Sequence, residues 1–179
     1  MKNLSNVALM MVFALSLSFV GCKKGENDPF ISLKSRDGRI TGTWVLSNVD
    51  KSLDKTVKSG GSTTSTKTTE TFDGTIWTTS GSTPQTDSIT YEITIEKDGT
   101  WSSIEVKNSA TVEESGYWQW TEAKKKKTGL FIANELWTID RLKNKEMVTI
   151  NNTVDKDTES NGDFEENIRT DTRTYTKKK

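Results

Sequence analysis

Few side chains in this chain of 179 residues can do chemistry. It has no His and only one Cys, Cys22, which excludes a Ser-His or Cys-His nucleophilic pair, a His-ligated metal, a thiolate metal cluster and an internal disulfide. Lys plus Arg and Asp plus Glu both number 25, so the chain lacks the basic excess that binding to nucleic acid requires. We expect no nucleic-acid partner, no metal and no cofactor.

Paired carboxylates are the remaining route to catalysis, because two of them can flank a glycosidic bond. The visible clusters are Glu113-Glu114 and Glu165-Glu166. Neighbouring residues of a strand point to opposite faces of a sheet, so neither pair can act on one bond. We therefore predict that the chain is not an enzyme and has no catalytic residue.

Residues 1–21 have the layout of a secretory signal peptide. Lys2 lies near the start, an apolar stretch of 14 residues covers positions 7–20, and the small Gly21 follows. As a helix this stretch would be about 21 Å long at about 1.5 Å per residue. The hydrocarbon core of a membrane is roughly 30 Å thick. We therefore expect a leader that is removed, not a membrane span.

The run Phe19-Val20-Gly21-Cys22 resembles the lipobox of bacterial lipoproteins. The resemblance implies that Cys22 is diacylated, becomes the first residue of the mature chain and anchors the protein to a membrane. Lys23 stands where an Asp would favour the inner membrane in enteric bacteria, so we expect the bacterial cell envelope, at the outer membrane. Residues 22–36 begin with polar residues interrupted by Gly and Pro, which predicts a flexible tether.

The body of the chain has the pattern of consecutive antiparallel strands. In residues 89–96 apolar and polar side chains alternate without interruption, as in a strand with one buried face. Asp98-Gly99 follows, a strong hairpin signal, and the return strand carries Trp101 and Ile104. Because the alternation changes parity between these two apolar residues, we predict a bulge at Ser102-Ser103.

Runs of strand-forming residues and turns recur through residues 37–179. About eight to ten strands must hide their edges, and strands joined by short turns favour an up-and-down antiparallel β-barrel. We predict an all-β fold, with at most a short helix near residues 32–39. We expect the Thr- and Ser-rich residues 53–82 to form a long edge hairpin that turns at Asp73-Gly74, rather than a loop.

Gly42-Thr43-Trp44 stands at the head of the first expected strand. With the lipobox and the strand Gly116-x-Trp118-x-Trp120, it makes the whole mature chain resemble the bacterial lipocalin-like lipoproteins. This resemblance implies a lipocalin-like barrel in which Gly42 begins the first strand and Trp44 packs across the closed end. It also implies that an Arg of the last strand lies over this Trp in a cation–π contact. The candidates are Arg169 and Arg173.

Four Trp residues on consecutive expected strands are the candidate ligand-binding residues: Trp101, Trp118, Trp120 and Trp137. They can line a pocket that grips an apolar ligand or stacks on a sugar, or they can fill the core of a chain poor in apolar residues. The first arrangement predicts a carrier of a small apolar or glycan ligand. The second predicts a surface protein–protein interaction module with a filled barrel, whose partner the sequence does not identify.

Overall fold

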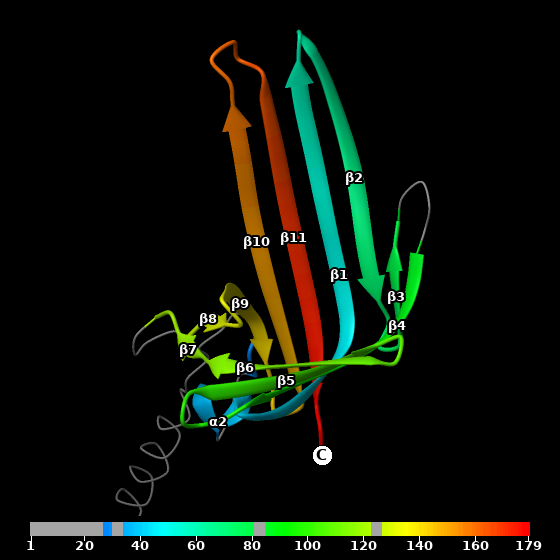
Figure 1. Ribbon diagram of the computed structural model, residues 1–179. Helices are drawn as coiled ribbons and strands as arrows, with labels where there is room; N and C mark the ends of the chain where they lie inside the picture. The colour runs from blue at the N-terminus through cyan, green and yellow to red at the C-terminus, as the bar shows by residue number, and fades with distance from the viewer. Residues whose placement is uncertain (1–26, 30–33, 81–84, 123–126) are drawn as a thin grey trace, which may run out of the picture.

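The computed structural model describes residues 27–29, 34–80, 85–122 and 127–179, so Cys22 and the predicted signal peptide lie outside the described residues. The described residues form an all-β fold with one short helix, α2 (Arg36–Ile40), which lies near the C-terminus at the base of the molecule (Figure 1). The strands are β1 (Gly42–Ser59), β2 (Ser62–Phe72), β3 (Ile76–Thr79), β4 (Gln85–Ile95), β5 (Thr100–Lys107), β6 (Ala110–Tyr117), β7 (Gln119–Trp120), β8 (Gly129–Ile132), β9 (Glu135–Leu142), β10 (Glu146–Thr158) and β11 (Phe164–Lys177).

The strands close an antiparallel β-barrel. On one side, residues 42–45 of β1 pair with residues 92–95 of β4. On the other side, β6 pairs with β5 and β7 pairs with β8, and only Trp118 separates β6 from β7. The order around the barrel is therefore β1, β4, β5, β6 with β7, β8, β9, β10 and β11, which pairs with β1 again. The prediction of an all-β antiparallel barrel is confirmed.

The described residues contain eleven strands, more than the eight to ten expected, because β2 and β3 are inserted between β1 and β4. The predicted turn at Asp73-Gly74 joins β2 to β3, but these strands share only the pairs from Glu70↔Thr79 to Phe72↔Trp77. β2 pairs over its whole length with the distal part of β1 instead. Residues 53–59, which were expected to belong to the edge hairpin, therefore form the distal part of β1.

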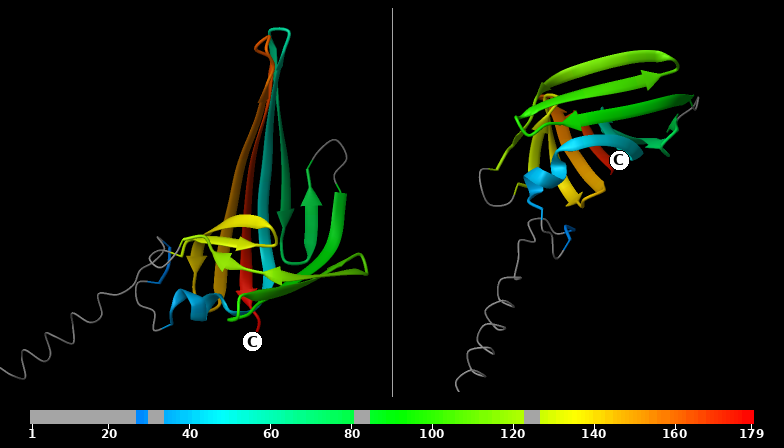
Figure 2. Two further views of the ribbon diagram at one scale, coloured as in Figure 1. Left: turned by 60° about the vertical axis from the view of Figure 1, so that its left-hand side comes forward. Right: turned by 90° about the horizontal axis from the view of Figure 1, so that it is seen from below.

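Four strands continue beyond the barrel as a single-layer sheet (Figure 1, and Figure 2, left). We call this part, residues 50–71 and 151–171, the projecting sheet; its strand order is β2-β1-β11-β10. Residues 50–59 alone would span about 33 Å at about 3.3 Å per residue. Among the described residues, positions 62–68 of β2 pair only with β1, and positions 151–158 of β10 pair only with β11. The projecting sheet therefore has two open edges.

One face of the projecting sheet continues the core-facing side of the barrel strands. Val49 of β1 is buried in the barrel core, and Lys51, Leu53, Lys55 and Val57 follow it on the same side of the strand. We call this side the inner face. Its cross-strand partners on β11 are Asp171, Arg169, Asn167 and Glu165, and those on β10 are Asn151, Thr153, Asp155 and Asp157.

The predicted bulge at Ser102-Ser103 is wrong. β5 pairs with β4 in an unbroken register from Ile95↔Trp101 to Ile89↔Lys107. Ser103 takes the inward position and is 4% exposed, whereas Ile104 points outward and is 46% exposed. The barrel accepts a small hydroxyl side chain inside and leaves a large apolar one outside, so hydrophobicity alone assigned the wrong face. Among the residues described, no helix has the length and apolar character needed to cross a membrane.

Candidate functional site

The barrel interior is filled by side chains. A space inside it, bordered by Tyr91, Trp137, Met147 and Tyr175 among other described residues, has a volume of about 40 Å³. Pockets that hold small molecules measure about 300–1,000 Å³. Thr149, whose buried hydroxyl has no hydrogen-bond partner among the described residues, also borders this space.

The four candidate Trp residues do not share one pocket. Trp101, Trp118 and Trp137 are core residues with exposures of 6%, 9% and 5%, and Trp120 is half-buried against that core. Trp118 and Trp120 pack edge to face at 5.8 Å, and Trp137 is the one Trp that borders the small interior space. The arrangement is that of core filling, the second alternative from the sequence.

Trp44 closes the base of the barrel, but Lys177 provides the cation. The Trp44 ring is fully buried and its Nε1 donates to the carbonyl of Ile40 at 2.6 Å. Lys177 Nζ lies 4.8 Å from the ring centroid, because Lys177 is the cross-strand partner of Trp44. Gly42 leaves room for this side chain, since a Cβ on Gly42 would be 2.8 Å from Lys177 Cε.

The expectation that Arg169 or Arg173 lies over Trp44 is therefore wrong. Arg169 and Arg173 lie eight and four positions before Lys177 in β11, on the side of the projecting sheet. Arg173 instead stacks on Trp137, with its guanidinium carbon 4.4 Å from the ring centroid. Arg169 is exposed on the inner face.

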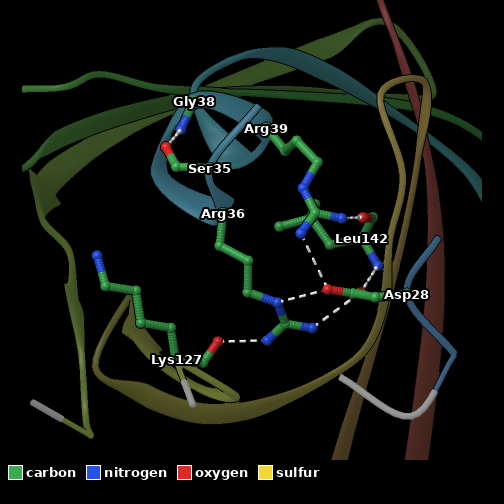
Figure 3. Close-up of polar contacts among 7 residues, drawn as sticks. All are labelled: Asp28, Ser35, Arg36, Gly38, Arg39, Lys127 and Leu142. Atoms are coloured by element: carbon green, nitrogen blue, oxygen red, sulfur yellow. Dashed lines mark hydrogen bonds and ion pairs between the residues drawn. The ribbon is translucent and has the colours of Figure 1, made fainter. Parts of the chain in front are cut away.

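A buried ion cluster joins the N-terminal segment to the base of the barrel (Figure 3). Asp28 Oδ2 accepts hydrogen bonds from Arg36 Nε at 2.8 Å and Arg39 Nη2 at 3.1 Å. Its Oδ1 accepts from Arg36 Nη2 and from the backbone N–H of Leu142, both at 2.9 Å. The two guanidinium groups also donate to the carbonyls of Lys127 and Leu142. Exposures of 5% for Asp28, 0% for Arg36 and 2% for Arg39 make this a structural lock.

The ionisation of Asp28 follows from these contacts. Burial alone would raise the pKa of Asp28, but the hydrogen bond and charge of Arg36, the N–H of Leu142 and the charge of Arg39 hold it below its ordinary value of 3.8. The carboxylate is thus charged at neutral pH and is shared by two arginines. The prediction of a flexible tether over residues 22–36 is wrong for Asp28 and Arg36, because both are bound into the folded domain.

A polar cleft lies where the inner face of the projecting sheet meets the β8–β9 turn. It has a volume of about 430 Å³. The sheet side is lined by Lys51, Arg169, Asp171 and Arg173 and by residues 151–153 of β10. The turn side contributes residues 134–136. The turn itself is formed by Ala133 and Asn134, which adopt left-handed φ angles of 53° and 60°. This cleft is about ten times larger than the space inside the barrel.

The cations of the cleft differ in how they are neutralised. Lys51 Nζ lies 3.0 Å from Glu70 Oε2, and Arg173 Nη2 lies 2.8 Å from Asp171 Oδ2. Arg169, in contrast, makes no hydrogen bond or ion pair with any other residue that the structure describes. A second hollow of about 530 Å³, lined by Leu53, Thr153 and Asn167 among others, also borders Arg169. This side chain therefore lies between two adjoining hollows on one face of the sheet.

Sequence patterns could have indicated part of this cleft. The alternation of Arg169, Asp171 and Arg173 along β11 places three charged side chains on one face. The position of the β8–β9 turn opposite that face has no sequence signal, because it depends on how the barrel closes. No three acidic or Cys side chains among the described residues converge as a metal site would require.

Comparison with family models, curated proteins and solved structures finds no match to this chain. The interpretation of its function therefore depends on the geometry of its own residues. That geometry consists of a filled barrel, an ion cluster that locks its base, and a long polar sheet with a cleft at its foot.

Proposed function

We propose that this chain is a lipid-anchored lipoprotein of the bacterial cell envelope, with a lipocalin-like barrel, that acts as a non-catalytic binding module through its projecting sheet. The filled barrel carries this proposal. An interior space of about 40 Å³ leaves no room for a carried ligand, so binding has to use the outer surface. A carrier of small apolar molecules is disfavoured for the same reason.

The composition of the projecting sheet supports a role in recognition. None of the buried apolar core residues lies in positions 53–68 or 153–169. These residues therefore add little hydrophobic stabilisation to the barrel, although ordering a residue in a strand costs about 1–2 kcal/mol of backbone entropy. A segment that the core does not require is best explained by what its surface contacts.

The position of the domain relative to its expected anchor also supports this role. The proposed anchor at Cys22 is six residues before Asp28, and Asp28 is fixed at the base of the barrel by Leu142 and two arginines. The projecting sheet extends from the opposite end (Figure 2, left). An acylated Cys22 would hold the base near the membrane and direct the sheet away from it, where a partner can reach it.

A shortened variant tests the proposal. The register pairs Ser52 with Thr69 and Asn152 with Thr170, so residues 53–68 and 153–169 can each be replaced by an Asn-Gly turn without shifting the remaining ladder. In cells, the wild-type chain should form chemical cross-links to envelope components, and the shortened variant should lose them while remaining membrane-bound. Cross-links that are fully retained by the shortened variant would contradict a role for the sheet.

The anchor is tested separately. Mass spectrometry of the membrane fraction should find acyl chains on Cys22, and a Cys22→Ser variant should be released from the membrane. An unmodified Cys22 in a membrane-bound wild-type protein would contradict the lipoprotein assignment and leave the test of the sheet unaffected.

A further inference from the structure

We infer that the polar cleft binds a carboxylate-bearing sugar unit of an acidic glycan, with Arg169 as the partner of the carboxylate. This inference rests on the proposed binding function and names the ligand class. Its starting observation is that Arg169 is exposed and without a partner among the described residues, whereas Lys51 and Arg173 in the same cleft are each paired with a carboxylate.

The planar guanidinium group of Arg169 suits a carboxylate, because its parallel N–H donors can form two charge-assisted hydrogen bonds. Arg169 stands between Leu53 of β1 and Thr153 of β10 in the pairing register, and neither neighbour competes for its charge. An anionic group entering the cleft therefore has one available cation in the described residues that line it.

The remaining lining suits hydroxyl groups. Asn134 and Asn151 carry amides that both donate and accept hydrogen bonds, and Thr153 carries a hydroxyl. Leu136, which is 58% exposed, offers an apolar surface for the C–H face of a sugar ring. A small polar ligand with many hydroxyls satisfies such a lining better than an apolar one does.

The acidic groups of the cleft limit how much negative charge the ligand can carry. Asp171 is held by Arg173, but Glu135 is exposed on the opposite wall and makes no ion pair with another residue that the structure describes. Glu135 can accept hydrogen bonds from hydroxyls, whereas it repels a second anionic group. One carboxylate together with several hydroxyls, as in a uronate, fits this distribution of charge.

The floor of the cleft favours a sugar over an extended peptide. Peptides commonly bind a sheet by adding a strand to an open edge through backbone hydrogen bonds. Lys51, Arg169 and Asp171 lie on β1 and β11, and at these positions both strands are paired on both sides. The floor formed by these two strands therefore presents side chains and no free backbone groups, so recognition there must come from side-chain amides, hydroxyls and charge. Positions 151–153 of β10 also line the cleft and have an open edge, so an acidic peptide is the competing ligand to be tested.

Calorimetric titration of the purified full-length protein in detergent tests this site with three probes: a trisaccharide that carries a single galacturonate unit, the methyl ester of that trisaccharide, and an end-capped tripeptide that carries a single glutamate. The acidic sugar should bind, and the methyl ester should bind about tenfold more weakly, because it keeps the hydroxyls but loses a charge-assisted pair. The acidic peptide should bind more weakly than the acidic sugar.

Two variants and a matched control locate the effect. Arg169→Gln should reduce the affinity for the acidic sugar to that for the ester and leave the ester unchanged. Asn151→Ala should weaken both sugars equally. Lys67→Gln, which removes a cation from the other face of the sheet, should change neither.

Equal affinity for the acid and the ester, an Arg169→Gln variant that binds like the wild type, tighter binding of the peptide, or no binding of either sugar would each overturn the inference. Cross-links that depend on the projecting sheet would in that case still support the proposed function. If those cross-links are also retained by the shortened variant, the proposed function itself is wrong.

Discussion

Lys177 lies over the indole of Trp44, with 4.8 Å between Nζ and the ring centroid, and the two residues are direct partners in the β1–β11 ladder. The same ammonium group donates to the carbonyls of Arg39 at 2.9 Å and Thr41 at 2.5 Å. One side chain of the last strand therefore joins the first strand, the short helix and the base of the core.

Replacing Lys177 by Met should destabilise the domain. The substitution keeps an aliphatic side chain but leaves the carbonyls of Arg39 and Thr41 without this donor and removes the cation from Trp44. We expect the free energy of unfolding in urea to fall by about 1–3 kcal/mol. Lys179→Met, at an exposed position two residues later, is the control and should have no effect. Equal stability of the two variants would show that the contact contributes nothing.

Gly42→Ala should be more destabilising than an ordinary substitution of a turn glycine. Gly42 has a φ of 118°, and an added Cβ would be 2.8 Å from Lys177 Cε. Gly162 also has a positive φ, 84°, above the left-handed region that other residues adopt, but has no atom within 4 Å of an added Cβ, so Gly162→Ala is a control for backbone strain without a collision. In a Lys177→Ala background the cost of Gly42→Ala should fall, because the colliding side chain is gone. An unchanged cost in that background would contradict the steric explanation.

Asp28→Asn should strongly destabilise the base of the barrel. It removes the charge that Arg36 and Arg39 share, and these guanidinium groups are 0% and 2% exposed. Breaking a buried ion pair by removing one partner costs about 3–5 kcal/mol. Chemical denaturation should show this loss, whereas Asp98→Asn, in the exposed β4–β5 turn, should cost much less. Similar losses for both variants would mean that the cluster is not a lock.

The contribution of Asp28 should also depend on pH. Its pKa in the folded state lies below 3.8, so the unfolded state binds a proton more readily. The stabilisation is therefore fully present above the unfolded pKa and is lost as the pH falls through the folded pKa. The stability difference between wild type and Asp28→Asn should stay constant from pH 7 down to about pH 5 and then shrink in more acidic solution. A difference that grows on acidification would reverse the sign and refute the assignment.

The shortened variant should keep a folded barrel. Residues 53–68 and 153–169 contribute no buried apolar core residue, and the ladder below Ser52 and Asn152 is unchanged. We expect its near-ultraviolet circular dichroism, which reports the packed Trp residues, to match that of the wild type. Loss of this signal would show that the sheet supports the barrel, and the cross-linking test would then need single substitutions on the inner face.

Local sequence patterns predicted the parts of the fold that depend on neighbouring residues. The alternation in residues 89–96 and the turn at Asp98-Gly99 correspond to β4, β5 and the hairpin between them. The turn at Asp73-Gly74 is also in place. Repeated short hairpins of this kind were sufficient to predict an antiparallel barrel, since a barrel is the way such strands remove most of their edges.

Contacts between distant residues were not predictable in the same way. Asp28 binds the N–H of Leu142, 114 positions later, and nothing near either residue indicates this. The cation over Trp44 depends on the register of β1 with β11, and an error of four or eight residues in that register selects Arg173 or Arg169 instead of Lys177. The projecting sheet is polar on both faces, so it lacks the alternation from which the ends of a strand are read.

β1 and β11 are paired from Trp44↔Lys177 to Lys58↔Phe164. The first strand of the domain therefore cannot complete its pairing until the last strand has been synthesised. When two segments so far apart in the sequence pair, the chain between them loses conformational entropy before the contacts form. This loss slows folding. The barrel can therefore close only after the whole chain has been synthesised. A product truncated before β11 would leave one side of β1 and the indole of Trp44 uncovered, and we expect proteases to degrade it.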